Sequence, residues 1–118
     1  MAPTSAPGGD PLGSQELLAL LAALGHTQRL RIIAELAGGR VHVSELARRL
    51  GLSRPLLYMH LERMEAAGLV VGSLELSADG KAMKYFALAP FDVRLTVDTI
   101  VAAVRADEQQ ADTEESPS

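Results

Sequence analysis

The segment from Val43 to Val71 restricts the fold of this chain more than any other. Residues Glu45 to Leu50 are predicted to form a short helix, with Ser44 as its N-cap and two leucines, four residues apart, on one face. Gly51 suits the left-handed position that follows the end of a helix. A glycine there predicts a tight turn directly after the helix.

A second helix is predicted after this turn. Ser53 is its expected N-cap, Pro55 falls in the first turn, where a missing N–H group costs nothing, and Gly68 ends it. Its apolar face is formed at spacings of four and three by Leu57, Leu61 and Met64. Two short helices around a glycine turn form a helix-turn-helix, whose second helix fits a DNA major groove about 12 Å wide. The same spacing also suits an ordinary helical hairpin.

The length of 118 residues indicates a single domain, and 47% hydrophobic residues suffice for a core. A chain of this size buries only about two-thirds of its unfolded surface, so a partner subunit would add stability. The absence of cysteine excludes disulfides and thiolate metal sites. Neither a run of about 18 apolar residues nor a signal-peptide pattern occurs, which predicts a cytoplasmic protein without a membrane partner.

Charge is distributed unevenly along the chain. The net charge of −4 includes five acidic residues among the last twelve, and the remainder carries a charge near +1. Between His26 and Arg63 there are seven arginines and three glutamates, a local charge of +4. Basic charge around a helix-turn-helix favours contacts with phosphates, although scattered surface arginines are also ordinary solvation.

Both ends of the sequence have the composition of disordered segments. Residues 1–13 contain three prolines and three glycines, and residues 107–118 are acidic and contain no aromatic residue. They are predicted to be a disordered arm and a disordered acidic tail. The folded domain is therefore expected over residues 14–106.

Two further helices are predicted before the helix-turn-helix. Ser14 is the expected N-cap of the first, in which Leu17 to Leu24 is apolar on nearly every side. Such a helix packs either between the core and a second subunit or wholly within the core. The next helix begins at His26 or Thr27. Its predicted apolar stripe consists of Leu30, Ile33, Ala34 and Ala37, with Arg29 and Arg31 outside it.

A β-hairpin is predicted after the helix-turn-helix. Its strands, residues 69–76 and 84–88, are mainly apolar and are separated by Ala78-Asp79-Gly80-Lys81. Asp-Gly suits turns that need a positive φ. Lys81 and Lys84 would lie on this hairpin, and a short extended segment at residues 40–43 would precede the helix-turn-helix.

The last predicted element is a helix that follows Pro90 and ends near Arg105, with Asp92 as its expected N-cap. Its apolar residues at helical spacing are Val93, Val97, Ile100, Val101 and Val104. This helix and the apolar helix near the N-terminus are predicted to form the surface between two subunits. The expected interface residues are Leu17, Leu18, Leu21, Val97, Ile100, Val101 and Val104.

The predicted order is helix, helix, short strand, helix, helix, hairpin, helix. It indicates a mainly α fold with a small β-hairpin, a winged helix-turn-helix with flanking N- and C-terminal dimerisation helices. Two motifs resemble the ArsR-type winged-helix repressors: LGHTQRLRIIAEL at Leu24–Leu36, and VSELARRLGLSRPLLYMHLERMEAAGLV at Val43–Val70. The resemblance covers about Leu17 to Arg105 and implies a DNA-binding regulator. MarR-like and PadR-like regulators share much of this pattern.

Four residues depart from the family pattern at positions that concern function. His26 and Thr27 replace the usual Asp-Pro, which changes a helix cap. Tyr58 and Met59 stand where the family often has Ser and His or Arg. No operator sequence of the family is therefore expected to apply here.

Catalysis and metal binding are not predicted. His26, His42 and His60 are far apart in the sequence, and none has a serine or aspartate at an activating spacing. His60 is expected to be packed and bonded locally, and His42 to face solvent. Metal-sensing relatives use cysteine pairs or Asp with His on the last helix, whereas this last helix offers only Asp92 and Asp98. The resemblance thus implies a non-metal-sensing member that is not an enzyme and has no cofactor.

The favoured function is a homodimeric, sequence-specific transcription regulator, a repressor that binds double-stranded DNA at an inverted-repeat operator. Arg54 is expected to contact base edges and Arg63 the DNA backbone. The residues expected at the DNA are Ser44, Ser53, Arg54, Leu56, Tyr58, Met59, Arg63, Lys81 and Lys84. A small molecule or a protein of unknown identity would be the effector. The alternative is a winged-helix module that binds protein through Leu56, Tyr58 and Met59 instead of DNA.

Overall fold

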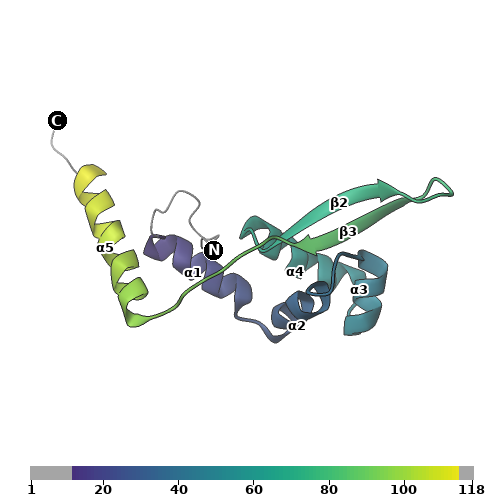
Figure 1. Ribbon diagram of the computed structural model, residues 1–118, viewed down its shortest axis with the longest axis horizontal. Coiled ribbons are helices and arrows are strands. Elements are labelled where there is room, and N and C mark those ends of the chain that lie inside the picture. The colour runs from purple at the N-terminus through teal and green to yellow at the C-terminus, as the bar shows by residue number, and fades with distance from the viewer. Residues whose placement is uncertain (1–11, 115–118) are drawn as a thin grey trace. The chain divides into compact units, whose positions relative to one another are not determined.

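The computed structural model describes residues 12–114, with side chains as far as residue 109. It divides into two compact units: the body (Ala22–Ala89), and the terminal unit, formed by the residues before Ala22 and after Ala89. The elements are, in chain order (Figure 1), α1 (Ser14–Leu24), α2 (Thr27–Leu36), β1 (Val41–His42), α3 (Val43–Leu50), α4 (Arg54–Ala66), β2 (Val70–Leu76), β3 (Ala82–Leu88) and α5 (Val97–Glu114). The predicted winged helix-turn-helix fold is confirmed.

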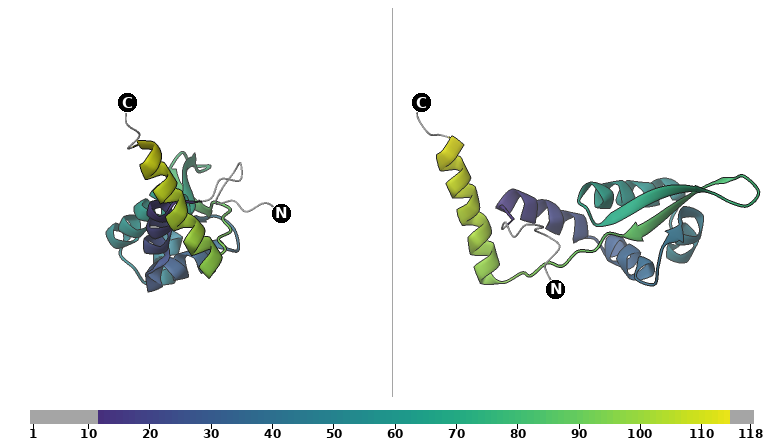
Figure 2. Two further views of the ribbon diagram at one scale, coloured as in Figure 1. Left: turned by 90° about the vertical axis from the view of Figure 1, so that its left-hand side faces the viewer. Right: turned by 45° about the horizontal axis from the view of Figure 1, so that its top comes forward.

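The sheet of the body is antiparallel, with the strand order β1-β3-β2. β2 and β3 pair along their whole lengths, and β1 pairs with β3 through Val41 and His42. At the predicted turn, the Ser77 N–H donates to the carbonyl of Lys81 (2.7 Å), and Gly80 has a φ of +85°. The hairpin extends beyond the helices of the body at this turn (Figure 2).

The core of the body lies between the sheet and α2, α3 and α4, which pack on one face of it (Figure 1). The predicted apolar face of α4 is confirmed, since Leu57, Leu61 and Met64 are fully buried. Phe86 of β3 reaches this core opposite Gly72 of β2. A Cβ atom on Gly72 would lie 2.9 Å from Cε1 of Phe86, so glycine is required there for the aromatic ring to pack.

The predicted apolar stripe of α2 is wrong. The buried residues are Arg29, Ile32 and Leu36, whereas Leu30 is 57% exposed. The prediction excluded Arg29 because an arginine is rarely buried without partners. In the fold, Arg29 has hydrogen-bond partners, His60 and the carbonyl of Ala22. The buried face of α2 is therefore shifted by about one residue from the predicted stripe.

Two of the predicted helix starts in the body are confirmed and one is wrong. Ser53 caps α4, and its hydroxyl accepts the Leu56 N–H (3.3 Å). His26, one of the two alternatives, caps α2. The N-cap of α3 is His42, not Ser44, because the Nδ1 atom of His42 accepts the Glu45 N–H (3.4 Å). α3 consequently begins at Val43, and Ser44 lies in its first turn.

The terminal unit corrects the prediction for α1. Its N-cap is Gly13, whose carbonyl accepts the Leu17 N–H (3.0 Å), and whose N–H donates to the Glu16 carboxylate (3.0 Å). Ser14 lies in the first turn. Its N–H donates to the Asp107 carboxylate of α5 (3.0 Å), and its hydroxyl donates to the same carboxylate. A carboxylate is favourable at the N-terminal end of a helix.

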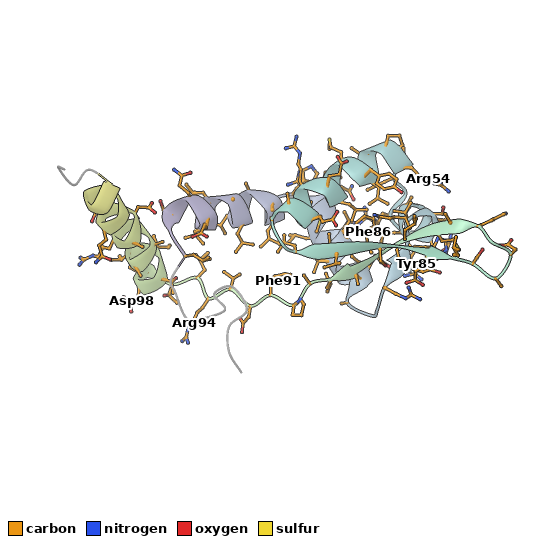
Figure 3. All side chains as sticks on the ribbon, turned by 90° about the horizontal axis from the view of Figure 1, so that it is seen from above. Arg54, Tyr85, Phe86, Phe91, Arg94 and Asp98 are labelled. Atoms are coloured by element: carbon orange, nitrogen blue, oxygen red, sulfur yellow. The ribbon has the colours of Figure 1, made fainter. Side chains whose placement is uncertain are left out.

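The predicted bounds of the last helix are wrong at both ends. Residues 89–96 are extended, with Phe91 and Arg94 along them (Figure 3). The cap is Thr96, not Asp92, because the Thr96 hydroxyl accepts the Thr99 N–H (3.1 Å) and the Thr99 hydroxyl accepts the Thr96 N–H (2.8 Å). α5 continues to Glu114, past the domain boundary expected after residue 106. The predicted disorder of residues 1–11 and 115–118 concerns positions outside the described residues.

Within residues 12–114, no single helix is long and apolar enough to cross a membrane. α1 and α2 reach the required length and composition only as a pair, and they are bent by 82° relative to each other.

Candidate nucleic-acid interface

The helix-turn-helix is built by local hydrogen bonds at the end of α3 and the start of α4. Gly51 takes the predicted left-handed conformation, with φ +68°. The Leu52 N–H donates back to the carbonyl of Ala47 (3.1 Å), which closes α3. With its apolar face buried, α4 exposes a face that carries Arg54, Leu56, Met59, Glu62 and Arg63.

Arg54 and Ser44, both predicted at the DNA, are brought together by the turn. The guanidinium of Arg54 donates to the hydroxyl of Ser44 at the N-terminal end of α4 (Figure 3). This bond uses one of the five N–H donors of the guanidinium, so others remain for a ligand. Ser53 lies beside them, exposed, with its hydroxyl engaged as the cap of α4.

Arg63 is exposed near the C-terminal end of α4. Glu62 lies next to it in the sequence, but no ion pair joins the two side chains among those that the structure describes. The guanidinium of Arg63 is therefore available to a phosphate or a base.

Most of the other arginines in the basic segment are paired with carboxylates. Arg48 and Arg49 of α3 both bind Glu45, and Arg49 also lies 3.6 Å from Glu35. Hydrogen bonds from Arg48 and then Arg49 lower the pKa of Glu45 to about 2. Three of the seven arginines thus form ion pairs, and the exposed arginines without a carboxylate partner among the described side chains are Arg31 of α2 and Arg54 and Arg63 at the two ends of α4.

A further arginine, Arg40, is held against the outer face of the sheet. It forms an ion pair with Glu75 of β2, and its guanidinium lies 4.2 Å from the ring centroid of Tyr85. Figure 3 labels Tyr85 and Phe86, neighbours whose side chains belong to opposite faces of β3. Arg40 therefore contributes little free charge to the helix-turn-helix.

The hairpin places its two predicted lysines differently. Lys81 is exposed at the turn, beside Asp79. Lys84 is half-buried, and its Nζ atom lies 5.6 Å from the ring centroid of Phe86. Lys81 is thus free to extend outward, whereas Lys84 is packed along the sheet.

Of the remaining residues predicted at the DNA, Leu56 and Met59 are each 40% exposed and Tyr58 is half-buried. Leu56 and Met59 are three residues apart and therefore lie on one face of α4. They form an apolar pair between the two arginines of that helix. This pair is called the α4 apolar pair below.

A buried polar cluster behind α4 was not predicted. The Arg29 Nε–H donates to Nδ1 of His60 (3.1 Å), and the Arg29 guanidinium also donates to the carbonyl of Ala22 (3.1 Å). The ring of His26 packs edge-on against His60, with centroids 4.6 Å apart. Burial lowers the pKa of His60, and the positive charges of His26, Arg29 and Arg63 lower it further.

His60 is buried as the sequence indicated, but its partner lies on α2 and is not local. A signal for its burial exists, because His60 is three residues after Leu57 and four before Met64, on the buried face of α4. Its bond to Arg29 joins α4 to α2.

The residues predicted at a dimer interface are mostly exposed in the single chain. Leu18 is 61% and Val97 is 76% exposed, and Leu17 is half-buried. The other exposed members are Leu21, Ile100, Val101 and Val104.

Among the described side chains, no group of three or more His, Asp or Glu residues is arranged to hold a metal ion.

Comparison with known proteins agrees with this geometry. Residues 26–71, which include α2, α3 and α4, match the family model described as bacterial regulatory protein, arsR family. The helix-turn-helix belongs to the arsR family. No curated protein matches the sequence significantly.

Solved structures similar to this chain share its fold. HlyU from Vibrio cholerae is 23% identical, with a TM-score of 0.53 over 88% of this chain and 96% of HlyU. NolR from Sinorhizobium fredii is 20% identical, with a TM-score of 0.54 over 89% of each chain.

A third similar structure is a homodimeric winged helix-turn-helix DNA-binding domain from Mycobacterium bovis, a possible ArsR-family transcriptional regulator. It is 19% identical, with a TM-score of 0.54 over 86% of this chain and 83% of that domain.

Proposed function

We propose that this protein is a homodimeric, sequence-specific DNA-binding regulator that represses transcription by occupying an inverted-repeat operator. The observation that carries the proposal is the exposed face of α4, which has an arginine free of carboxylates at each end. The family of its helix-turn-helix, which consists of bacterial regulatory proteins, supports the same function.

On this proposal, the two arginines of α4 have different roles. Arg54, at the N-terminal end, contacts a base edge or a phosphate in the major groove, with Ser44 holding its guanidinium. Arg63 contacts the backbone where the helix leaves the groove. Lys81, exposed at the hairpin turn, reaches the adjacent minor groove or its phosphates.

The dimer is proposed from the apolar side chains that α1 and α5 leave exposed. Contiguous apolar surface on a soluble protein marks an interaction site. The similar domain from Mycobacterium bovis is described as homodimeric, which supports the same assembly here. Two-fold symmetry would place two copies of α4 about 34 Å apart, the spacing of successive major grooves on one side of DNA.

The proposed effector is a small molecule or a protein and not a metal ion. The chain contains no cysteine, and α5 has no histidine. Carboxylates without imidazole or thiolate are poor ligands for zinc, copper or nickel.

A fluorescence titration with promoter fragments tests the DNA-binding proposal. Phosphate contacts predict that affinity falls steeply between about 50 and 200 mM salt. An affinity that barely changes over this range would overturn the proposal. Selection of bound sequences from a random DNA pool would then identify the operator, and an inverted repeat among them is the expected result.

A protein-binding module is the second candidate, and the α4 apolar pair favours it. Exposed leucine and methionine are common on surfaces that bind protein partners. The random-pool selection separates the two candidates, because a protein-binding module would enrich no DNA sequence.

A further inference from the structure

We propose that the α4 apolar pair recognises the 5-methyl groups of pyrimidines in the major groove. The operator half-site would then carry thymine between the positions contacted by Arg54 and Arg63. This inference rests on the proposed function, and it specifies the bases that the same helix recognises.

The side chains available on α4 support this chemistry. The helix sequence, RPLLYMHLERMEA, contains no Asn, Gln, Ser, Thr or Lys. The bidentate contact of Asn or Gln with adenine is therefore impossible from this helix. Thymine offers a methyl group in the major groove, and apolar side chains are its usual partners there.

The geometry of the pair also suits adjacent bases. Leu56 and Met59 are separated by three residues, which is about 4.5 Å along a helix. Successive bases of one strand are about 3.4 Å apart along the DNA axis. The two side chains can therefore contact methyl groups on neighbouring base pairs.

The core of the body does not need these two side chains. Leu57, Leu61 and Met64 fill the buried face of α4 and are fully inaccessible to solvent, whereas Leu56 and Met59 are each 40% exposed. An apolar contact in the groove would remove this exposed surface from water. Glu62, exposed one residue before Arg63, would add an acceptor for the amino group of cytosine at the far end of the half-site.

The test replaces thymine by uracil within the selected operator, a change that removes only the methyl group. Burial of one methyl group predicts affinity about three- to fivefold weaker for each contacted thymine replaced. Uracil placed outside the half-sites should change nothing. In a further operator, the contacted thymine is changed to cytosine, which also lacks the methyl group. Replacing that cytosine by 5-methylcytosine should restore part of the lost affinity, because its methyl group occupies the same place in the groove as that of thymine.

Protein variants locate the contact. Leu56→Ala and Met59→Ala should each lose the preference for thymine over uracil at one of the two base pairs and keep it at the other. Leu30→Ala removes a comparably exposed leucine from α2 and should keep the full preference for thymine. Because both target side chains lie partly in solvent, circular dichroism should show that the variants remain folded.

Three results would overturn the inference while leaving the proposed function intact. These are a selected operator without thymine between the arginine contacts, equal affinity of the wild type for thymine and uracil operators, or an unchanged thymine preference in both alanine variants. Failure to select any DNA sequence would instead overturn the proposed function, and this inference with it.

Discussion

The body and the terminal unit bury their apolar side chains to different extents. In the body, the side chains of α4 that face the core are fully buried, and even Arg29 and His60 are enclosed with hydrogen-bond partners. In the terminal unit, Ala103 is buried, but Leu18 and Val97 are largely exposed. The body thus completes its own core, whereas the terminal unit presents an apolar surface.

This difference indicates that the apolar side chains of the body stabilise the fold, whereas those of the terminal unit are available for association with a partner. A buried apolar side chain stabilises the fold by its removal from water, and an exposed one contributes only when a partner covers it. Two packings were predicted for α1, either between the core and a second subunit or wholly within the core. The exposure of Leu18 and Leu21 favours packing against a second subunit. Changes in the two regions should consequently have different effects.

The largest effect is expected from charges on the terminal unit. The double variant Leu18→Glu/Leu21→Glu should be a monomer or should fail to fold, because two leucines would lose burial worth about 3–6 kcal/mol in total. Analytical ultracentrifugation measures the oligomeric state, and circular dichroism the folded fraction. A double variant that remained a folded dimer would place the interface elsewhere.

A core substitution in the body should act on folding instead. Leu61→Ala should lower the free energy of unfolding by about 2–5 kcal/mol, because Leu61 is fully buried. Urea denaturation measures this change. Leu30→Ala, at an exposed position, is the matched control and should change stability by about 0.5 kcal/mol or less. Similar losses for the two variants would contradict the packing of the body.

The two arginines of α4 should differ in how they affect DNA binding. Arg54→Ala should cost about 1–3 kcal/mol on the operator and relax the preference at one base pair per half-site. Arg63→Ala should weaken all sequences alike and reduce the salt dependence by about one unit per contact removed. Titrations of both variants on operator and scrambled DNA at several salt concentrations make the comparison.

Equal losses on operator and scrambled DNA for Arg54→Ala would mean that the other end of α4 enters the groove. Neither arginine variant should alter the dimer, since both residues belong to the body. A change in oligomeric state would therefore contradict the separation of the two regions.

The smallest effect is a pH dependence of stability that originates in the buried cluster of the body. His60 has a lowered pKa in the fold, so the unfolded chain binds its proton more readily. Stability should be complete above the unfolded histidine pKa of about 6.5 and should fall as the pH decreases below it. Urea midpoints at mildly acidic and mildly alkaline pH measure this loss.

His60→Asn is the matched variant, because an amide can accept the Arg29 hydrogen bond without titrating. It should reduce the loss of stability on acidification. If the variant and the wild type lost stability equally, the dependence would originate in other groups.

Much of the fold was predictable from the sequence because its signals are local. Ser53 caps α4, Gly51 adopts the left-handed conformation after α3, and Gly80 forms the hairpin turn, each through contacts within a few residues. Leu57 and Leu61 are likewise buried as their spacing indicated. Caps, turns and helical spacing depend on neighbouring residues, so the sequence alone carries them.

Other features depend on residues that are distant in the sequence. The burial of Arg29 requires His60, which lies 31 positions away. Ser14 and Asp107 of the terminal unit bond across 93 positions. Because this partner is distant, the acidic sequence from Asp107 onward predicted a disordered tail, whereas α5 continues there. A local pattern cannot indicate a partner that only the folded chain brings near.

Some features of the candidate site were likewise predictable from the sequence, and others depend on the tertiary structure. The sequence predicted Arg54, Leu56, Met59 and Arg63 as residues at the DNA, and all four side chains are exposed. In the local charge calculated from the sequence, every arginine of the basic segment contributed equally. The pairs of Arg48 and Arg49 with Glu45 have the helical spacings of three and four residues that a sequence carries. Only the tertiary structure paired Arg40 with Glu75 and enclosed Arg29, because these partners are distant in the sequence. Which arginines remain accessible to DNA is therefore determined partly by the sequence and partly by the fold.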